Sequence, residues 1–206
     1  VYFLAEVAPY SRFRVPPNPL PWLLDRLIPS RELDRLTDAI DRAATVANRQ
    51  ALAAYHVRAG AWDLASQELE RCLTGIYKDD PGLKHMLAEV RFKAGDLKAA
   101  ETLLEATRAE APRHDPQLRE FLLARIAEER GDAEAAFVLY ERLREAGPIT
   151  EEARVRLAML FEARGDRERA RALYKEVVRR MQTANNTYRR EQRPWLKLAR
   201  EKLKQA

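Results

Sequence analysis

The residues that could perform chemistry are few, and they are scattered along the sequence. The 206-residue chain holds one cysteine, Cys72, and three histidines, His56, His85 and His114. A catalytic nucleophile needs a base beside it, but Cys72 falls where the helical pattern packs a small residue, so we interpret it as a buried structural thiol. The histidines lack metal-ligand spacing, and no phosphate-binding glycine loop or His-Glu-x-x-His run is present. We therefore expect no enzyme, no cofactor and no metal site.

The composition favours an all-α protein. Charged residues make up 33% of the chain and aromatic residues 8%, and only seven residues are glycine. No stretch reaches the roughly 18 consecutive apolar residues that a transmembrane helix needs. A single cysteine also excludes an intramolecular disulfide framework. The length suits one domain or a solenoid of small units.

Four segments of the sequence share a pattern centred on a glycine. The glycines are 35, 36 and 34 residues apart, at Gly60, Gly95, Gly131 and Gly165. Five residues after each comes an alanine (Ala65, Ala100, Ala136, Ala170), and four residues later Leu69, Leu104, Tyr140 or Tyr174. Eight residues before each glycine a Leu-Ala pair begins, at Leu52, Leu87, Leu123 and Leu157. Such a period predicts stacked structural repeats.

The repeated residue types indicate two helices per unit. Glycine ends the first helix because it adopts the left-handed conformation without strain. The aspartate that follows in three units (Asp96, Asp132, Asp166) can cap the second helix. The two alanines let the helices approach closely, and Pro112 and Pro148 end the second helix. One hairpin cannot bury its apolar face alone, so the units must stack.

This pattern resembles the tetratricopeptide repeat (TPR) family over residues 47–182. The resemblance implies an all-α, right-handed superhelical solenoid of antiparallel hairpins that binds a protein or peptide partner. Three features depart from the family, and one is that the proline of the first unit is displaced by about four residues, in Asp79-Asp80-Pro81. The family's large aromatic residue in the first helix is replaced by Arg49, Lys84, Glu120 and Arg154, and its small residue there is alanine.

The chain divides into three parts. Residues 1–29 hold six of the eleven prolines, and we interpret them as a juxtamembrane, proline-rich linker. Residues 30–182 carry the repeats, preceded by a helix from Arg31 to about Ala44 that Ser30 would cap. Residues 183–206 form a basic C-terminal capping helix that covers the last apolar face, and Pro194 would kink or restart it.

The first eight residues, Val-Tyr-Phe-Leu-Ala-Glu-Val-Ala, are followed by Arg12 and Arg14 and look like the end of a membrane helix. Packing on the domain is the alternative. A chain that begins at Val1 indicates a fragment or a processed form. With Thr-Val-Ala-Asn-Arg at 45–49, Cys-Leu-Thr-Gly at 72–75 and Tyr-Arg-Arg-Glu-Gln-Arg-Pro-Trp at 188–195, this start resembles bacterial TPR proteins. Their N-terminal membrane segment is similar to that of phospholipase D and cardiolipin synthase-type proteins, although the His-Lys-Asp motif of those enzymes is missing here.

That resemblance implies attachment to the bacterial inner membrane, with the cytoplasmic side favoured for the repeats, or otherwise a cytoplasmic protein.

The repeat family binds partners through the first helices of its units. The inward positions of a candidate groove are then Gln50, Ala54, Val57, Arg58, His85, Glu89, Phe92, Lys93, Phe121, Arg125, Glu128, Val155, Met159 and Glu162. The alternative is that Phe92, Phe121 and Met159 belong to the core. The Lys/Asn clamp with which related chaperone adaptors hold a C-terminal carboxylate is missing.

The positive charge is concentrated at the C-terminus. Residues 175–206 carry a net charge of +7, and the rest of the chain carries −2. A candidate basic patch consists of Arg179, Arg180, Arg189, Arg190, Arg193 and Lys197. We predict a scaffold for protein–protein contacts, with binding of anionic lipid or nucleic acid through this patch as the alternative and nucleic acid disfavoured. A homo-oligomer could form through Trp22, Leu23, Leu24, Leu27 and Ile28, or through Trp195.

Overall fold

The computed structural model describes residues 31–205. Within this range the chain forms eleven α-helices, one short 3₁₀-helix and no strand, which confirms the predicted all-α fold. The apolar start of the chain, the proline-rich linker and Ser30 lie outside the described residues. Over the described range no helix is both long and apolar enough to cross a membrane.

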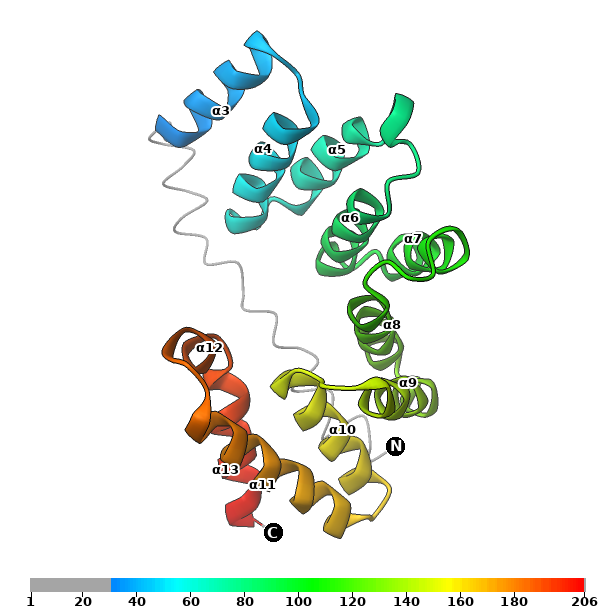
Figure 1. Cartoon of the computed structure of the whole chain (residues 1–206), viewed down its shortest axis with the longest axis vertical. Coiled ribbons are helices and arrows are strands. Elements are labelled where there is room, and N and C mark those ends of the chain that lie inside the picture. The colour runs from blue at the N-terminus through cyan, green and yellow to red at the C-terminus, as the bar shows by residue number, and fades with distance from the viewer. Residues whose placement is uncertain (1–30, 206) are drawn as a thin grey trace. The chain divides into compact units, whose positions relative to one another are not determined.

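Eight helices form four successive antiparallel hairpins (Figure 1). The chain enters them through α3 (Arg31–Arg42), which packs on α4. The hairpins are α4 (Val46–Arg58) with α5 (Trp62–Cys72), α6 (Pro81–Ala94) with α7 (Leu97–Glu110), α8 (Pro116–Arg130) with α9 (Ala133–Ala146), and α10 (Glu151–Ala163) with α11 (Arg167–Thr183). The 3₁₀-helix η1 (Gly75–Tyr77) joins the first two hairpins.

The turn inside each hairpin has the predicted chemistry. All four repeat glycines have positive φ angles, of 72° at Gly60, 90° at Gly95, 80° at Gly131 and 82° at Gly165. The side chains of the three predicted aspartate caps each accept a hydrogen bond from the backbone N–H three residues later (Asp96, Asp132, Asp166). The second helices end at Glu110 and Ala146, two residues before Pro112 and Pro148, also as predicted.

The alanines of the pattern occupy the tightest part of the packing. Every one is at most 1% exposed, both in the first helices (Ala53, Ala88, Ala124, Ala158) and in the second (Ala65, Ala100, Ala136, Ala170). The leucines and tyrosines of the pattern surround them and are also buried. Small side chains at the contact therefore bring the helix axes together, and large side chains fill the space on either side.

The chain forms two compact units, and the division falls inside α8, between Arg119 and Glu120. In the unit that contains α3 to α7, the core is built around Leu69, Leu83, Leu87 and Val90. In the unit that contains α9 to α13, a larger core includes Leu157, Leu160 and Val177 together with the two repeat tyrosines. Each unit thus has its own apolar centre.

The C-terminal cap consists of two helices where the sequence suggested one. After α11, Asn185 caps the short α12 (Asn186–Glu191), and α13 (Arg193–Gln205) then begins with Pro194 as its second residue. Of the two predicted outcomes, a kink or a restart at Pro194, the structure has the restart, because proline is tolerated in the first turn of a helix. Leu198 and Ala199 are buried where α13 packs against α10 and α11.

Replacing Gly165 by alanine tests the turn. No atom lies within 4 Å of an added Cβ, so strain at the positive φ is the whole cost. We expect Gly165→Ala to lower the free energy of unfolding by about 1 kcal/mol. Asparagine tolerates this conformation better, so Gly165→Asn should lose less. Urea unfolding measures both values, and equal losses would show that φ is not the cause.

Candidate functional site

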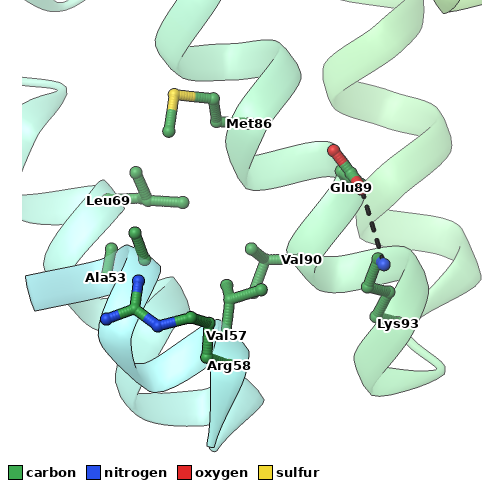
Figure 2. Close-up of a pocket in the computed structure, with 9 residues that line it drawn as sticks. Ala53, Val57, Arg58, Leu69, Met86, Glu89, Val90 and Lys93 are labelled. Carbon is green, nitrogen blue, oxygen red and sulfur yellow. Dashed lines mark ion pairs between the residues drawn. The ribbon is translucent and has the colours of Figure 1, made fainter. Parts of the chain in front are cut away.

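A pocket of about 310 Å³ lies between the first helices of the first two hairpins, α4 and α6 (Figure 2). Its volume is at the lower end of the range for small ligand sites. The lining comes from α4, α6 and one residue of α5, and consists of Ala53, Ala54, Val57, Arg58, Leu69, Met86, Glu89, Val90 and Lys93. The pocket lies wholly within one compact unit, so its geometry is set by local helix packing.

The inner wall of the pocket is apolar and its rim is charged. Leu69 and Val90 belong to the core, and Val57 packs against them. At the rim Lys93 Nζ lies 3.6 Å from Glu89 Oε1, and Arg58 Nη2 lies 2.6 Å from Glu32 Oε1 on α3. The side chains of Arg58 and Lys93 are 58% and 42% exposed. Such a site suits an apolar side chain flanked by residues of both charges.

The pocket brings together five of the eight positions predicted from the first two hairpins. Ala54, Val57, Arg58, Glu89 and Lys93 all line it. The other three do not: Gln50 donates a hydrogen bond to Met86 Sδ at 3.5 Å, His85 is only 6% exposed, and Phe92 is half-buried. Sequence reasoning missed Ala53, Leu69, Met86 and Val90.

The misses have a geometric cause. The prediction assigned nearly equivalent positions to every first helix, but a pocket between neighbours is lined by one side of α4 and the opposite side of α6. The lining residues can be counted back from the glycine that follows each first helix. In α4 they stand seven, six, three and two residues before Gly60, and in α6 they stand nine, six, five and two residues before Gly95. A shift of one residue turns a side chain by about 100° around a helix. Only the residues six and two positions before the glycine line the pocket in both helices, so only these two positions can be predicted from one repeat for the next.

The groove residues predicted in the second compact unit lie in a network of ion pairs. Glu128 Oε2 accepts hydrogen bonds from Arg156 Nη1 and Tyr140 Oη, both at 2.9 Å. The side chains of Glu128 and Arg156 are 3% and 5% exposed. Arg125 reaches Glu152, and Glu152 accepts a second bond from Arg156. These groups stabilise the packing of α8 against α10 and offer little free surface to a partner.

The remaining predicted positions of this unit are also largely buried. Val155 is 0% exposed and Met159 is 6% exposed, and Phe121 packs against the same core, as the alternative interpretation held for Phe121 and Met159. Glu162 accepts hydrogen bonds from Tyr174 Oη at 3.1 Å and Lys202 Nζ at 2.8 Å. Lys202 belongs to α13, so this carboxylate ties the cap to the fourth hairpin.

Burial and neighbouring charges shift the pKa of two residues in this network, Tyr140 and Arg156. Burial raises the pKa of the Tyr140 phenol well above 10, and the nearby Glu128 carboxylate raises it further. Burial alone would lower the pKa of the Arg156 guanidinium, but the opposing effects of Glu128, Tyr140 and Glu152 raise it above its ordinary value. Arg156 also stacks over the Trp195 ring, 4.9 Å from the centroid. Trp195, predicted as an oligomer contact, is therefore engaged within its own chain.

A signal for this network is present in the sequence. The positions three before and nine after the glycine face each other within a hairpin. They hold Val57 and Leu69, then Phe92 and Leu104, in the first two units, but a Glu–Tyr pair in the last two. A simultaneous change from apolar to hydrogen-bonding residues at both positions marks a contact that has become polar.

The position eleven residues before each glycine forms an ion pair with the second helix of its own hairpin. Arg49 pairs with Glu68 at 2.8 Å, Lys84 with Glu110, Glu120 with Arg142 at 3.8 Å, and Arg154 with Glu176 at 3.2 Å. The third pair reverses the order of the charges. These are the positions at which the sequence departs from the family's aromatic residue.

The candidate basic patch is divided among three helices, α11, α12 and α13. Arg180 pairs at 2.9 Å with Glu151, which is 0% exposed. Arg189 is bonded to Asn186, and Lys197 lies 3.8 Å from Glu201. Arg179, Arg190 and Arg193 are exposed. Binding of lipid or nucleic acid through this patch stays a prediction.

Cys72 is 1% exposed, as predicted, and its thiol donates to the Glu68 carbonyl at 3.3 Å. Burial raises the pKa of this thiol, which disfavours the reactive thiolate. Across residues 31–205, no group of three or more His, Cys, Asp or Glu side chains is arranged to hold a metal ion.

Two segments of the chain match models of the tetratricopeptide repeat family, over residues 56–126 and 152–180. Solved TPR structures share the fold. TTC0263, a thermophilic TPR protein of Thermus thermophilus, aligns with a TM-score of 0.59 and 18% identity over 87% of this chain and 97% of its own.

Two further crystal structures are similar. A structure of MamA aligns with a TM-score of 0.58 and 15% identity, over 71% of this chain and 85% of its own. YrrB, described as a TPR protein with an unusual peptide-binding site, aligns with a TM-score of 0.53 and 16% identity, over 86% of this chain and 91% of its own. No curated protein matches the sequence. At these identities the likeness establishes the fold alone.

The substitution Glu128→Gln tests whether the buried ion pairs stabilise the fold. Glu128→Gln leaves the Arg156 charge buried and partly unpaired, so we expect it to lower the free energy of unfolding by about 3 kcal/mol. The control is Glu134→Gln, which removes a pair with Arg164 at a carboxylate that is 80% exposed, and it should cost less than about 1 kcal/mol. Urea unfolding compares the two variants, and similar losses would contradict a structural role for Glu128.

His85 predicts a dependence of stability on pH. Among the described residues neither ring nitrogen has a hydrogen-bond partner. Burial lowers the pKa of the ring below 6.5, against the opposing charges of Glu89 and Asp115 and with the help of His114 and Arg119. The unfolded chain therefore binds this proton more readily than the folded chain. The contribution of His85 is complete above about pH 6.5 and is lost as the pH falls below it.

Unfolding of the His85→Leu variant at pH 7.5 and pH 5 measures this effect. The wild type should lose more stability between the two values than the variant does. His56, whose pKa burial also lowers, leaves part of the dependence in place. An unchanged loss in the variant would exclude His85 as a source.

Proposed function

We propose that this chain is a protein-interaction scaffold that holds a segment of a partner protein in the pocket between α4 and α6. The observation that carries the proposal is an apolar cavity between two neighbouring first helices, with a rim that carries charges of both signs. TPR proteins generally mediate protein–protein interaction, and YrrB, which shares the fold, has a peptide-binding site.

The chemistry of the pocket indicates the kind of segment that it would hold. One or two apolar side chains would displace water from the wall formed by Val57, Leu69 and Val90. Charged neighbours in the bound segment would pair with Arg58, Glu89 and Lys93 at the rim. In this proposal the protein acts by holding its partner and performs no catalysis.

Membrane attachment belongs to the same proposal and rests on the sequence alone. The residues on which it depends, 1–14, lie outside the described part of the chain. A tether there would place the scaffold at the inner membrane of a bacterium, with the repeats on the cytoplasmic side favoured. Fractionation of the natural protein in its host tests this point directly.

A blocked pocket should weaken partner binding. Ala54 is exposed on α4 and lines the pocket, so Ala54→Arg fills the entrance without disturbing the core. Peptides selected from a random displayed library on the full chain serve as probes. We expect Ala54→Arg to weaken their binding at least tenfold, about 1.4 kcal/mol.

The matched control is Ala172→Arg, which adds the same side chain at an exposed position on α11. It should bind the selected peptides as the wild type does. If both variants bind as tightly as the wild type, or both lose binding equally, the pocket is not the binding site.

A further inference from the structure

We infer that the pocket between α4 and α6 is occupied, in the chain without a partner, by the chain's own segment Trp22–Ile28. This intramolecular docking makes the N-terminal segment a competitor for any partner that binds there. The docking depends only on the pocket and the sequence. Its regulatory consequence rests on the proposed function.

The entry of the chain into the described structure lies at the rim of the pocket. Glu32, in the first turn of α3, pairs with Arg58, which lines the pocket. The chain that precedes Arg31 therefore starts beside this rim. Ile28 lies three positions before Arg31, and this stretch can span about 10 Å at most. Trp22 lies nine residues before Arg31 and can reach about 30 Å from it.

The pocket is open to solvent. Met86 is 37% exposed although it lines the cavity, and Ala54 and Glu89 are exposed as well. The neighbouring α3 is also incompletely covered. Its apolar residues Leu33, Leu36 and Ile40 are only half-buried, and the helix has no buried residue. Partly exposed apolar side chains are thus present both on α3 and in the pocket.

The segment has the composition that the pocket requires. Five of its seven residues are apolar (Trp22, Leu23, Leu24, Leu27, Ile28), and the other two, Asp25 and Arg26, carry one charge of each sign. The rim likewise offers cations at Arg58 and Lys93 and an anion at Glu89. A tethered segment has a high effective concentration at its site. Modest contacts are therefore enough to keep the pocket filled.

The methionine methyl groups report on this docking in the full chain. The protein has three methionines, and only Met86 lines the pocket. Met159 and Met181 are buried in the other compact unit and serve as internal references. With ¹³C-methyl methionine, we expect Trp22→Ala to move the Met86 signal while the Met159 and Met181 signals keep their positions. Tyr10→Ala, which removes another aromatic ring of the N-terminal region, should leave all three unchanged.

The position of the Met86 signal in the wild type should not vary with protein concentration, because the segment belongs to the same chain. If the Met86 signal keeps its position in Trp22→Ala, the docking proposal is wrong. A change that appears only at high concentration overturns it too, in favour of exchange between two copies.

The same variant tests the regulatory consequence separately. Removing the competitor should tighten the binding of the selected peptides in Trp22→Ala relative to wild type. If Met86 responds but no displayed peptide binds either protein, the docking stands and the proposed function fails. If peptides bind both proteins equally and Met86 does not respond, the proposed function stands and the docking fails.

Discussion

The contact between two helices at buried alanines is the constraint on which the rest of the structure depends. Each hairpin places one alanine of its first helix and one of its second at positions that are at most 1% exposed. A larger side chain there would separate the helices and open the space that the neighbouring leucines and tyrosines fill. The glycine turn serves this contact, since it reverses the chain within a few residues and lets the cap of the second helix form at once.

Because the alanines set the distance between the helices, other positions of the repeat are free to change their chemistry. The place of the family's large aromatic residue is taken by charged side chains, and in every hairpin that side chain pairs with the second helix. An ion pair that is partly exposed contributes little to stability. The apolar contact at the alanines therefore stabilises the hairpin, and the charges select which surfaces meet.

Prediction from the sequence succeeded where a residue acts within its own hairpin. The sequence correctly predicted the roles of Gly165, Asp166, Ala170 and Tyr174, because the turn, the helix cap and the helix contact all depend on spacing along the chain. Prediction failed where two hairpins meet. Met86 and Val90 were missed because the side of α6 that faces α4 depends on how the hairpins stack, and Glu128 was assigned to a surface because its partner Arg156 is a hairpin away. The segment before Arg31, interpreted as a linker, lies outside the described residues.

The reversed ion pair of the third hairpin has a consequence for assembly. Helix pairs with similar sequences offer similar contacts, so a like-charge contact is one feature that can tell them apart. Here α9 presents Arg142 to an acidic Glu120, whereas the first helices of the other three hairpins carry Arg49, Lys84 or Arg154 at that place. Any of these would set two cations side by side against α9. The third hairpin is thus distinguished from the others by its charges, because a first helix with a cation at this place would meet Arg142 without an ion pair to offset the repulsion.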